Sequence, residues 1–174
     1  MSIWEKCYSK TLKFEGEFQD NPKDKGNWTG GEIGLGILKG TKYGISAASY
    51  PSLDIKSLTQ EQAIEIYRRD FWNEMHLSAI DSNRVAWKIF DIAVNCGQRT
   101  AAKILQKSVG VEPDGVIGDV TLRAVNTSDN VKLLSEIVHY QQHHYLSIRN
   151  LMNEGFFKGW MKRSEDTAPE LEAI

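Results

Sequence analysis

The amino-acid sequence predicts a mainly α-helical protein with one small glycine-rich β element near its N-terminus. Beyond Pro51, apolar residues recur at helical spacing, and polar residues able to cap a helix precede several of these runs. Seven of the 14 glycines lie between residues 26 and 44. In that window Ile33, Leu35 and Ile37 alternate with glycines, which indicates a short hairpin or a looped pair of strands.

The first predicted helix covers residues 3–14 and has one apolar face. That face consists of two rows of residues four apart, namely Trp4, Tyr8 and Leu12, flanked by Ile3, Cys7 and Thr11. Gly16 is a plausible stop for this helix.

The remaining helices are predicted from their caps and their periodicity. Thr59 and Gln62 form a capping box at the start of one helix, and Asp81 or Ser82 caps the next, which ends at Gly97. Further helical segments are predicted over residues 100–109 and 119–124, and a long helix opened by Ser128 or Asp129 extends to residue 152. The terminal segment at 155–163 is rich in large apolar residues and is predicted to pack on the core. Two helical sections therefore meet near residue 98.

The composition excludes several classes of protein. The chain has 174 residues, of which 41% are hydrophobic and 25% charged, as in soluble globular proteins. The net charge of −2 gives no global basic field that would attract nucleic acid or anionic lipid. No apolar run is long enough to insert into a membrane. The N-terminus lacks the pattern of a signal peptide, so we expect synthesis in the cytoplasm.

The two cysteines, Cys7 and Cys96, both stand among apolar residues at helical spacing. The prediction is two reduced, buried thiols. A disulfide is the alternative if the protein works outside the cytoplasm.

The stretch LKFEGEFQD, residues 12–20, contains the best candidate for a catalytic group. Glu15 is predicted in the last turn of its helix, where unpaired carbonyl groups and neighbouring phenylalanines would raise its pKa. A carboxylic acid that is still protonated near neutral pH can protonate the leaving oxygen in glycoside hydrolysis. The alternative is a solvated surface glutamate. Polar candidates on the facing glycine-rich wall are Asp20, Asp24, Thr29 and Thr41.

Other candidate sites are weaker. His139 and His143 have the spacing of two metal ligands on a helix, but Tyr140 stands where a zinc hydrolase would need a glutamate. No third ligand is evident, so we predict neither a metal nor a cofactor. Trp28, in the glycine-rich loop, is a candidate for stacking on a sugar ring, whereas the other four tryptophans fit helical faces in the core.

Four ordered segments resemble glycoside hydrolase family 108, the bacterial and prophage N-acetylmuramidases. They are FEGEF at 14–18, GTKYGIS at 40–46, the helix from Leu58 to Trp72, and FDIAVNCG at 90–97. From about residue 101 the chain resembles the predicted peptidoglycan-binding section of these proteins. The resemblance implies a lysozyme-like, phage-type muramidase fold, with a catalytic section at 1–97 and a binding section at 98–174 that pack as one globular unit.

The resemblance also implies site residues. It places the catalytic glutamate on Glu15, although Phe14 and Glu17 replace a histidine and a glycine of the family motif. Related phage lysozymes carry an aspartate nine positions after this glutamate, which corresponds to Asp24 here, with Asp20 as the rival. Thr41 is the candidate for their threonine.

Two further residues are candidate sugar contacts. They are Tyr43 and Asn95; for Asn95 the alternative is a role in capping its helix before Gly97.

The implied reaction is hydrolysis of the β-1,4 bond between N-acetylmuramic acid and N-acetylglucosamine in peptidoglycan. Glu15 would donate the proton, and Asp24 with Thr41 would position water or stabilise the oxocarbenium-like centre. We expect a monomeric, bacteriolytic enzyme of the endolysin or prophage type, which reaches the cell wall by assisted release. The alternative is an inactive peptidoglycan-binding or secretion-associated module on the same scaffold.

Overall fold

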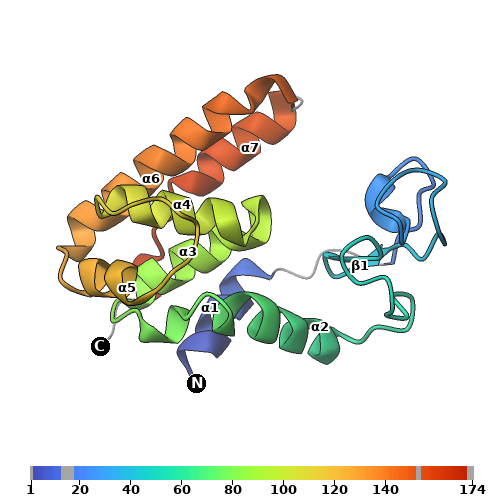
Figure 1. The fold of residues 1–174 in the computed structure, drawn as a ribbon, viewed down its shortest axis with the longest axis horizontal. Coiled ribbons are helices and arrows are strands. Elements are labelled where there is room, and N and C mark those ends of the chain that lie inside the picture. The colour runs from blue at the N-terminus through green and yellow to red at the C-terminus, as the bar shows by residue number, and fades with distance from the viewer. Residues whose placement is uncertain (1, 13–17, 152–153, 172–174) are drawn as a thin grey trace. The chain divides into compact units, whose positions relative to one another are not determined.

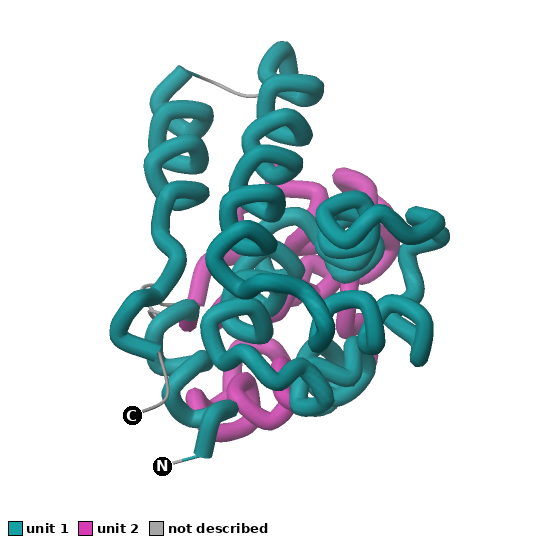
Figure 2. The backbone as a smooth tube through the Cα atoms, turned by 90° about the vertical axis from the view of Figure 1, so that its left-hand side faces the viewer, with its two compact units in different colours: residues 1–11, 69–174 teal, residues 12–68 magenta. Residues whose placement is uncertain are grey.

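The computed structural model describes residues 2–12, 18–151 and 154–171. The chain is mainly helical with one small antiparallel hairpin, as predicted (Figure 1). It divides into two compact units (Figure 2). The helical unit consists of residues 1–11 and 69–174, and the glycine-rich unit of residues 12–68.

The regular elements follow one another along the chain in a simple order. The α-helices are α1 (Ile3–Thr11), α2 (Gln60–Tyr67), α3 (Asn83–Cys96), α4 (Gln98–Ser108), α5 (Asp119–Asn126), α6 (Asn130–Ser147) and α7 (Glu154–Ser164), and the strands are β1 (Thr41–Lys42) and β2 (Ile45–Ser46). Short 3₁₀ turns lie at Lys25–Asn27, Leu77–Ala79, Arg149–Leu151 and Pro169–Leu171, and a π-helical segment lies at Arg68–Asn73. No helix in the described part of the chain is long and apolar enough to cross a membrane.

Helix α3 is the centre of the helical unit, and every residue from Val85 to Ala93 is buried. Phe90 of this helix forms an aromatic cluster with Trp4 of α1 and with Trp72, with ring centroids 5.3 to 5.8 Å apart. Aromatic side chains bury the largest apolar areas, so this cluster is a main source of hydrophobic stabilisation. Three of the four tryptophans predicted in the core are buried, and Trp160 is half-buried against Tyr145.

Two charged residues lie within this otherwise apolar part of α3. The Lys88 ammonium donates hydrogen bonds to the carbonyl oxygens of Ser164, at 2.6 Å, and Asp166, at 2.8 Å. Burial lowers the pKa of Lys88 to about 8. Lys88 thus binds the chain that leaves α7 to the middle of α3.

Asp91, which is 1% exposed, ties two more elements to α3. Its carboxylate accepts hydrogen bonds from both Nε and an Nη of Arg163, at 3.1 and 2.6 Å, and from the Thr11 hydroxyl at 3.2 Å. The last residue of α1 and the end of α7 are therefore both attached to one buried carboxylate. A bidentate arginine partner of this kind compensates the cost of burying the charge.

Some predicted helix ends are confirmed and others are wrong. Thr59 and Gln62 form the predicted capping box, and the side chains of Ser82 and Asp129 cap α3 and α6. Helix α6 ends at Ser147 instead of continuing to residue 152. The Ser147 hydroxyl donates to the carbonyl of His144, which competes with continuation of the helix.

Helix α1 is also shorter than predicted. It ends at Thr11, and Leu12 is no longer helical. The prediction that Glu15 stands in the last turn of this helix concerns a residue outside the described ones and stays a prediction.

The hairpin of the glycine-rich unit lies later in the chain than the predicted one. Strands β1 and β2 pair Thr41 with Ser46, and the two turn residues, Tyr43 and Gly44, both have positive φ, at 52° and 77°. This is the requirement of a tight two-residue hairpin turn.

The predicted strand alternation around Ile33, Leu35 and Ile37 is wrong. Gly34 and Gly36 between them have φ values of 81° and 83°, which interrupt an extended strand, and the three apolar side chains are exposed.

The two compact units follow a different boundary from the predicted sections 1–97 and 98–174. Residues 69–97 pack with the C-terminal helices, since α3 contacts both α4 and α6. The predicted sections were defined by resemblance rather than by packing, and that division stays a prediction.

Candidate active site

Glu15, the predicted acid, lies outside the described residues, as do its neighbours Phe14 and Glu17. The site is therefore built from the described polar residues of the glycine-rich unit. These residues meet around one buried side chain, Asn27.

Asn27 is fully buried, and its side-chain amide has a partner for every hydrogen-bonding position. The Nδ2 group donates to Gln19 Oε1 at 2.8 Å and to the Asn21 carbonyl at 3.0 Å. The Oδ1 atom accepts from Gln19 Nε2 at 3.1 Å and from the Thr41 hydroxyl at 2.7 Å. The backbone carbonyl of Asn27 accepts from the amides of Lys39 and Gly40. One buried residue thus fixes the chain segments on both sides of the glycine-rich loop.

Asp24 lies at the exposed edge of this network. One carboxylate oxygen caps the 3₁₀ turn by accepting from the Gly26 amide at 2.9 Å, and the other accepts from Gln19 Nε2 at 3.3 Å. The carboxylate is oriented by the protein, yet the residue is open to solvent. A group in this position can still contact a water molecule or a substrate.

Thr41 is held on the other side of the network by its backbone as well as its hydroxyl. The amide and carbonyl of Thr41 exchange hydrogen bonds of 2.8 and 3.0 Å with Gln19. Gly40 precedes it with φ of 83°, and a Cβ there would lie 2.5 Å from the Gln19 carbonyl oxygen. Glycine is therefore required for Gln19 and Thr41 to pair this closely.

The structure connects Asp24 with Thr41 through Gln19 and Asn27. Asp20, the rival aspartate, is exposed and lines a separate cavity of about 400 Å³ with Phe18, Lys39 and Asp54. Within the described part of the chain, no hydrogen bond of the Asp20 carboxylate is found. The geometry favours Asp24 over Asp20 as the partner of Thr41.

The candidate sugar contacts have different surroundings. Tyr43 occupies the left-handed turn position, where a bulky residue is unusual, and its carbonyl accepts from the Tyr67 hydroxyl at 3.2 Å. Trp28 is half-buried, and its indole nitrogen donates to the Pro22 carbonyl at 3.0 Å. Both residues belong to the same unit as Asp24 and Thr41.

Thr29 and Asn95 are not brought into this network. The Thr29 hydroxyl accepts from the Ile37 amide at 2.9 Å and stabilises the glycine-rich loop. Asn95 belongs to the helical unit and donates to the carbonyl of Asp91 at 2.6 Å. The capping residue of α3 is Gly97, with φ of 84°, so the capping alternative for Asn95 is wrong.

The histidines and cysteines offer no obvious reactive centre. His139 and His143 are exposed on α6, and no group of three metal-ligating side chains occurs among the described residues. Cys7 is fully buried, and burial raises its pKa to about 12. Cys96 is only half-buried, contrary to the prediction, and both thiols are free.

Sequence reasoning missed Gln19 and Asn27. Asparagine in a glycine-rich loop is ordinarily a turn residue, and nothing in its neighbourhood distinguishes a buried amide from an exposed one. The one available signal for Asn27 is its position three residues after Asp24, because residues three apart meet in a 3₁₀ turn.

Comparison with known proteins agrees with this fold. The family model for glycosyl hydrolase 108 matches residues 8–97, and the model named "Predicted Peptidoglycan domain" matches residues 100–165. A search of curated proteins gives no significant match. Among solved structures, that of Brucella abortus SagA is similar, with a TM-score of 0.74 and 28% sequence identity over 94% of this chain and 90% of that chain.

The first match covers more than half of the chain and includes Asp24, Asn27, Thr41 and the position of Glu15. The second match, over residues 100–165, supports peptidoglycan as the substrate. This chain is therefore a glycoside hydrolase that belongs to the glycosyl hydrolase 108 family.

Proposed function

We propose that this enzyme hydrolyses the β-1,4 bond between N-acetylmuramic acid and N-acetylglucosamine in peptidoglycan, with Glu15 as the general acid. The observation that supports the site is the network in which Gln19 and buried Asn27 link Asp24 with Thr41. The glycosyl hydrolase 108 match includes all of these positions.

The proposed roles follow from the chemistry of each group. Glu15 protonates the glycosidic oxygen as the bond to the anomeric carbon breaks. Asp24 has an exposed carboxylate, which can accept a proton from a water molecule or stabilise positive charge on the sugar ring. The Thr41 hydroxyl donates to Asn27, so its lone pairs remain able to accept a hydrogen bond from that water.

The bond that is cleaved can be identified from the products. Purified peptidoglycan is digested with the wild-type protein, the new reducing ends are reduced with borohydride, and the fragments are analysed by mass spectrometry. The expected product ends in reduced N-acetylmuramic acid. Fragments that end in reduced N-acetylglucosamine would contradict the proposed bond specificity, and sedimentation with the wall without cleavage would indicate a binding module instead.

The network makes a prediction about Asn27. Asn27→Ala leaves the Thr41 hydroxyl and the Gln19 side chain without their buried partner, at a cost of about 1–3 kcal/mol in the free energy of unfolding. Misplacement of Asp24 and Thr41 is expected to lower kcat by about 10²-fold. Thermal unfolding and reducing-end kinetics measure the two effects.

Asn21→Ala is the matched control for Asn27→Ala, since it removes the same type of side chain from an exposed position in the same unit. It leaves the backbone carbonyl that Asn27 uses in place. Near-normal kcat in the folded Asn27→Ala protein would show that the network has no part in catalysis.

A further inference from the structure

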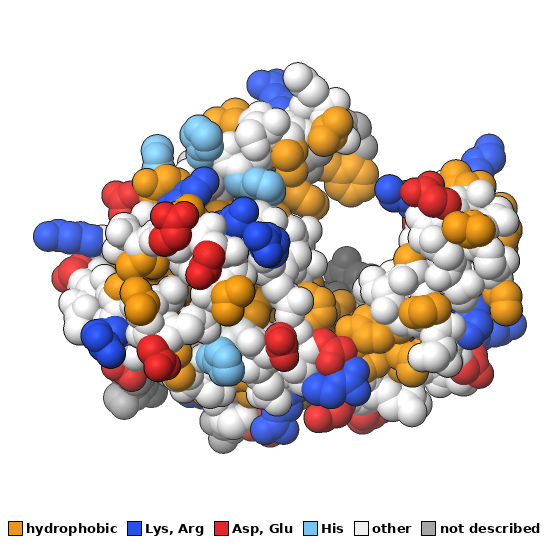
Figure 3. Space-filling view, viewed as in Figure 1, with side chains coloured by type: hydrophobic (Ala, Val, Ile, Leu, Met, Phe, Trp, Pro, Cys, Tyr) orange, Lys and Arg blue, Asp and Glu red, His pale blue; other side chains and the backbone are white. Residues whose placement is uncertain are grey.

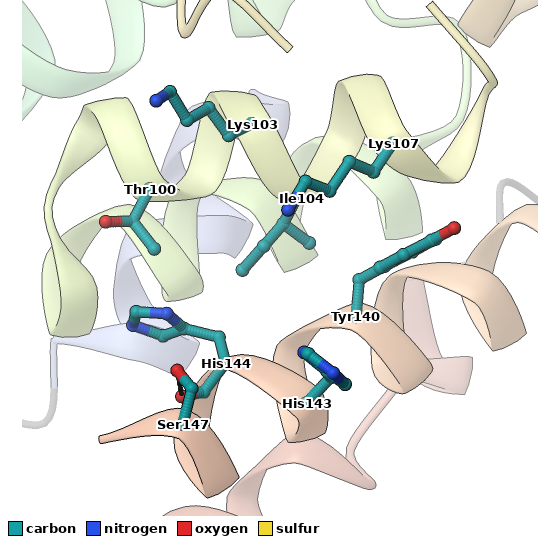
Figure 4. Close-up of a pocket in the computed structure, with 8 residues that line it drawn as sticks. All are labelled: Thr100, Lys103, Ile104, Lys107, Tyr140, His143, His144 and Ser147. Carbon is teal, nitrogen blue, oxygen red and sulfur yellow. Dashed lines mark hydrogen bonds between the residues drawn. The ribbon is translucent and has the colours of Figure 1, made fainter.

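A cavity of about 350 Å³ lies between α4 and α6, in the region matched by the predicted peptidoglycan domain (Figure 4). Helix α4 contributes Lys103, Ile104 and Lys107 to its lining, and α6 contributes Tyr140, His143 and His144. All of these residues belong to the helical unit, so this pocket is formed within one compact unit.

The lining of the pocket is basic around an apolar floor. None of its eight lining residues is acidic. Ile104 is buried and points from α4 toward α6, and the side chain of Lys107 runs along α4 toward it (Figure 4). Lys103 and Lys107 are one helical turn apart, and no ion pair of either lysine is found among the described residues. Both lysines line the pocket, which has no carboxylate in its lining, and in Figure 4 the Lys107 ammonium lies beside Ile104 whereas the Lys103 side chain extends away from α6.

His144 of α6 lies close enough to Lys107 of α4 to feel its charge. Partial burial and repulsion from the Lys107 ammonium both lower the pKa of His144. Figure 3 shows histidine and basic side chains over this part of the helical unit, with acidic side chains among them outside the pocket lining. Since the whole chain carries a net charge of −2, this basic character is local.

We propose that this pocket binds carboxylate groups of the peptide stem of peptidoglycan. The inference rests on the proposed function, in which peptidoglycan is the substrate of this enzyme. The glycan strand itself offers hydroxyl and acetamido groups and would not need cations. The stem peptide carries free carboxylates and small alkyl side chains, which match the ammonium groups and the Ile104 floor.

Binding of the stem would give the enzyme a second attachment to the polymer that it cleaves. Two weak contacts with one polymer raise the overall affinity, because the second contact forms at a high effective concentration. Affinity of the pocket for a single short peptide is expected to be weak and to fall as salt is added.

The test uses the full chain and the free tetrapeptide L-Ala–D-Glu–diaminopimelate–D-Ala. Addition of the tetrapeptide at low salt is expected to shift the NMR signals of the His143 and His144 rings. The double variant Lys103→Gln/Lys107→Gln is expected to bind at least about fivefold more weakly. The same peptide with its carboxylates amidated is expected not to bind.

The matched control is Lys132→Gln/Lys162→Gln, which removes the same charge from exposed positions outside the pocket lining. Thermal unfolding verifies that both double variants are folded. Equal weakening by both double variants, unchanged binding to Lys103→Gln/Lys107→Gln, or no binding of the tetrapeptide would overturn the proposal. Tighter binding of glycerol phosphate than of the tetrapeptide would also overturn it, in favour of a phosphate-bearing polymer.

This experiment is independent of catalysis, because the tetrapeptide contains no glycosidic bond. If the tetrapeptide binds the pocket but peptidoglycan is not cleaved, the proposed function fails while the binding site stands. If N-acetylmuramic acid ends are produced but the tetrapeptide does not bind, only the present proposal fails.

Discussion

Glu15→Gln is expected to lower kcat for peptidoglycan hydrolysis by about 10²- to 10⁴-fold. Glutamine is close to glutamate in size but cannot donate a carboxylic proton to the glycosidic oxygen, so the leaving group must depart without protonation. The free energy of unfolding is expected to change by no more than about 0.5 kcal/mol. Reducing-end kinetics on purified peptidoglycan and thermal unfolding of the same preparations measure both quantities.

Glu17→Gln is the matched control, because it makes the same chemical change two residues further along the chain. We expect it to retain most of the wild-type kcat. A large loss for Glu17→Gln together with normal kcat for Glu15→Gln would move the acid to Glu17. A large loss of stability in Glu15→Gln would identify Glu15 as a structural carboxylate.

Asp91→Ala is expected to have the largest effect on stability, about 3–5 kcal/mol in the free energy of unfolding. The change leaves the Arg163 guanidinium, which donates two hydrogen bonds to Asp91, without its partner. It also removes the acceptor of the Thr11 hydroxyl at the end of α1. For a chain of this length the midpoint of thermal unfolding should fall by roughly 10 °C.

Two further variants distinguish the pair of buried Asp91 and half-buried Arg163 from ordinary surface charges. Glu170→Ala removes an exposed carboxylate that pairs with half-buried Lys10, which keeps Asp166 as a partner, and is expected to cost less than about 1 kcal/mol. Asp91→Leu combined with Arg163→Met replaces both charges by apolar groups and should recover part of the loss. A small effect of Asp91→Ala, comparable to that of Glu170→Ala, would contradict the importance of the buried carboxylate.

Local signals predicted the helical part of the fold well. The capping box at Thr59 and the caps at Ser82 and Asp129 depend on hydrogen bonds between residues three apart, so they can be read from neighbours in the chain. The ends of α1 and α6 were predicted too late, because periodicity continues past the residue at which the helical backbone stops.

The candidate site was predictable only in part. The pairing of Asp24 with Thr41 was suggested by the order of motifs along the chain. Their link through Gln19 and Asn27 was not, since four side chains spread over 23 residues meet only after the glycine-rich loop has folded. Likewise, the sequence around Asp91 shows only a family motif, because its partners Thr11 and Arg163 lie 80 and 72 residues away in the chain.

The sequence by itself determined the helical class of the protein, its family and the residues to consider for catalysis, because spacing, caps and ordered motifs are properties of the chain alone. Only the tertiary structure decided which polar residues act together, where the hairpin lies and that a basic pocket forms between α4 and α6. Each of these depends on contacts between residues distant in the chain, and on whether a side chain is buried, which local patterns do not specify.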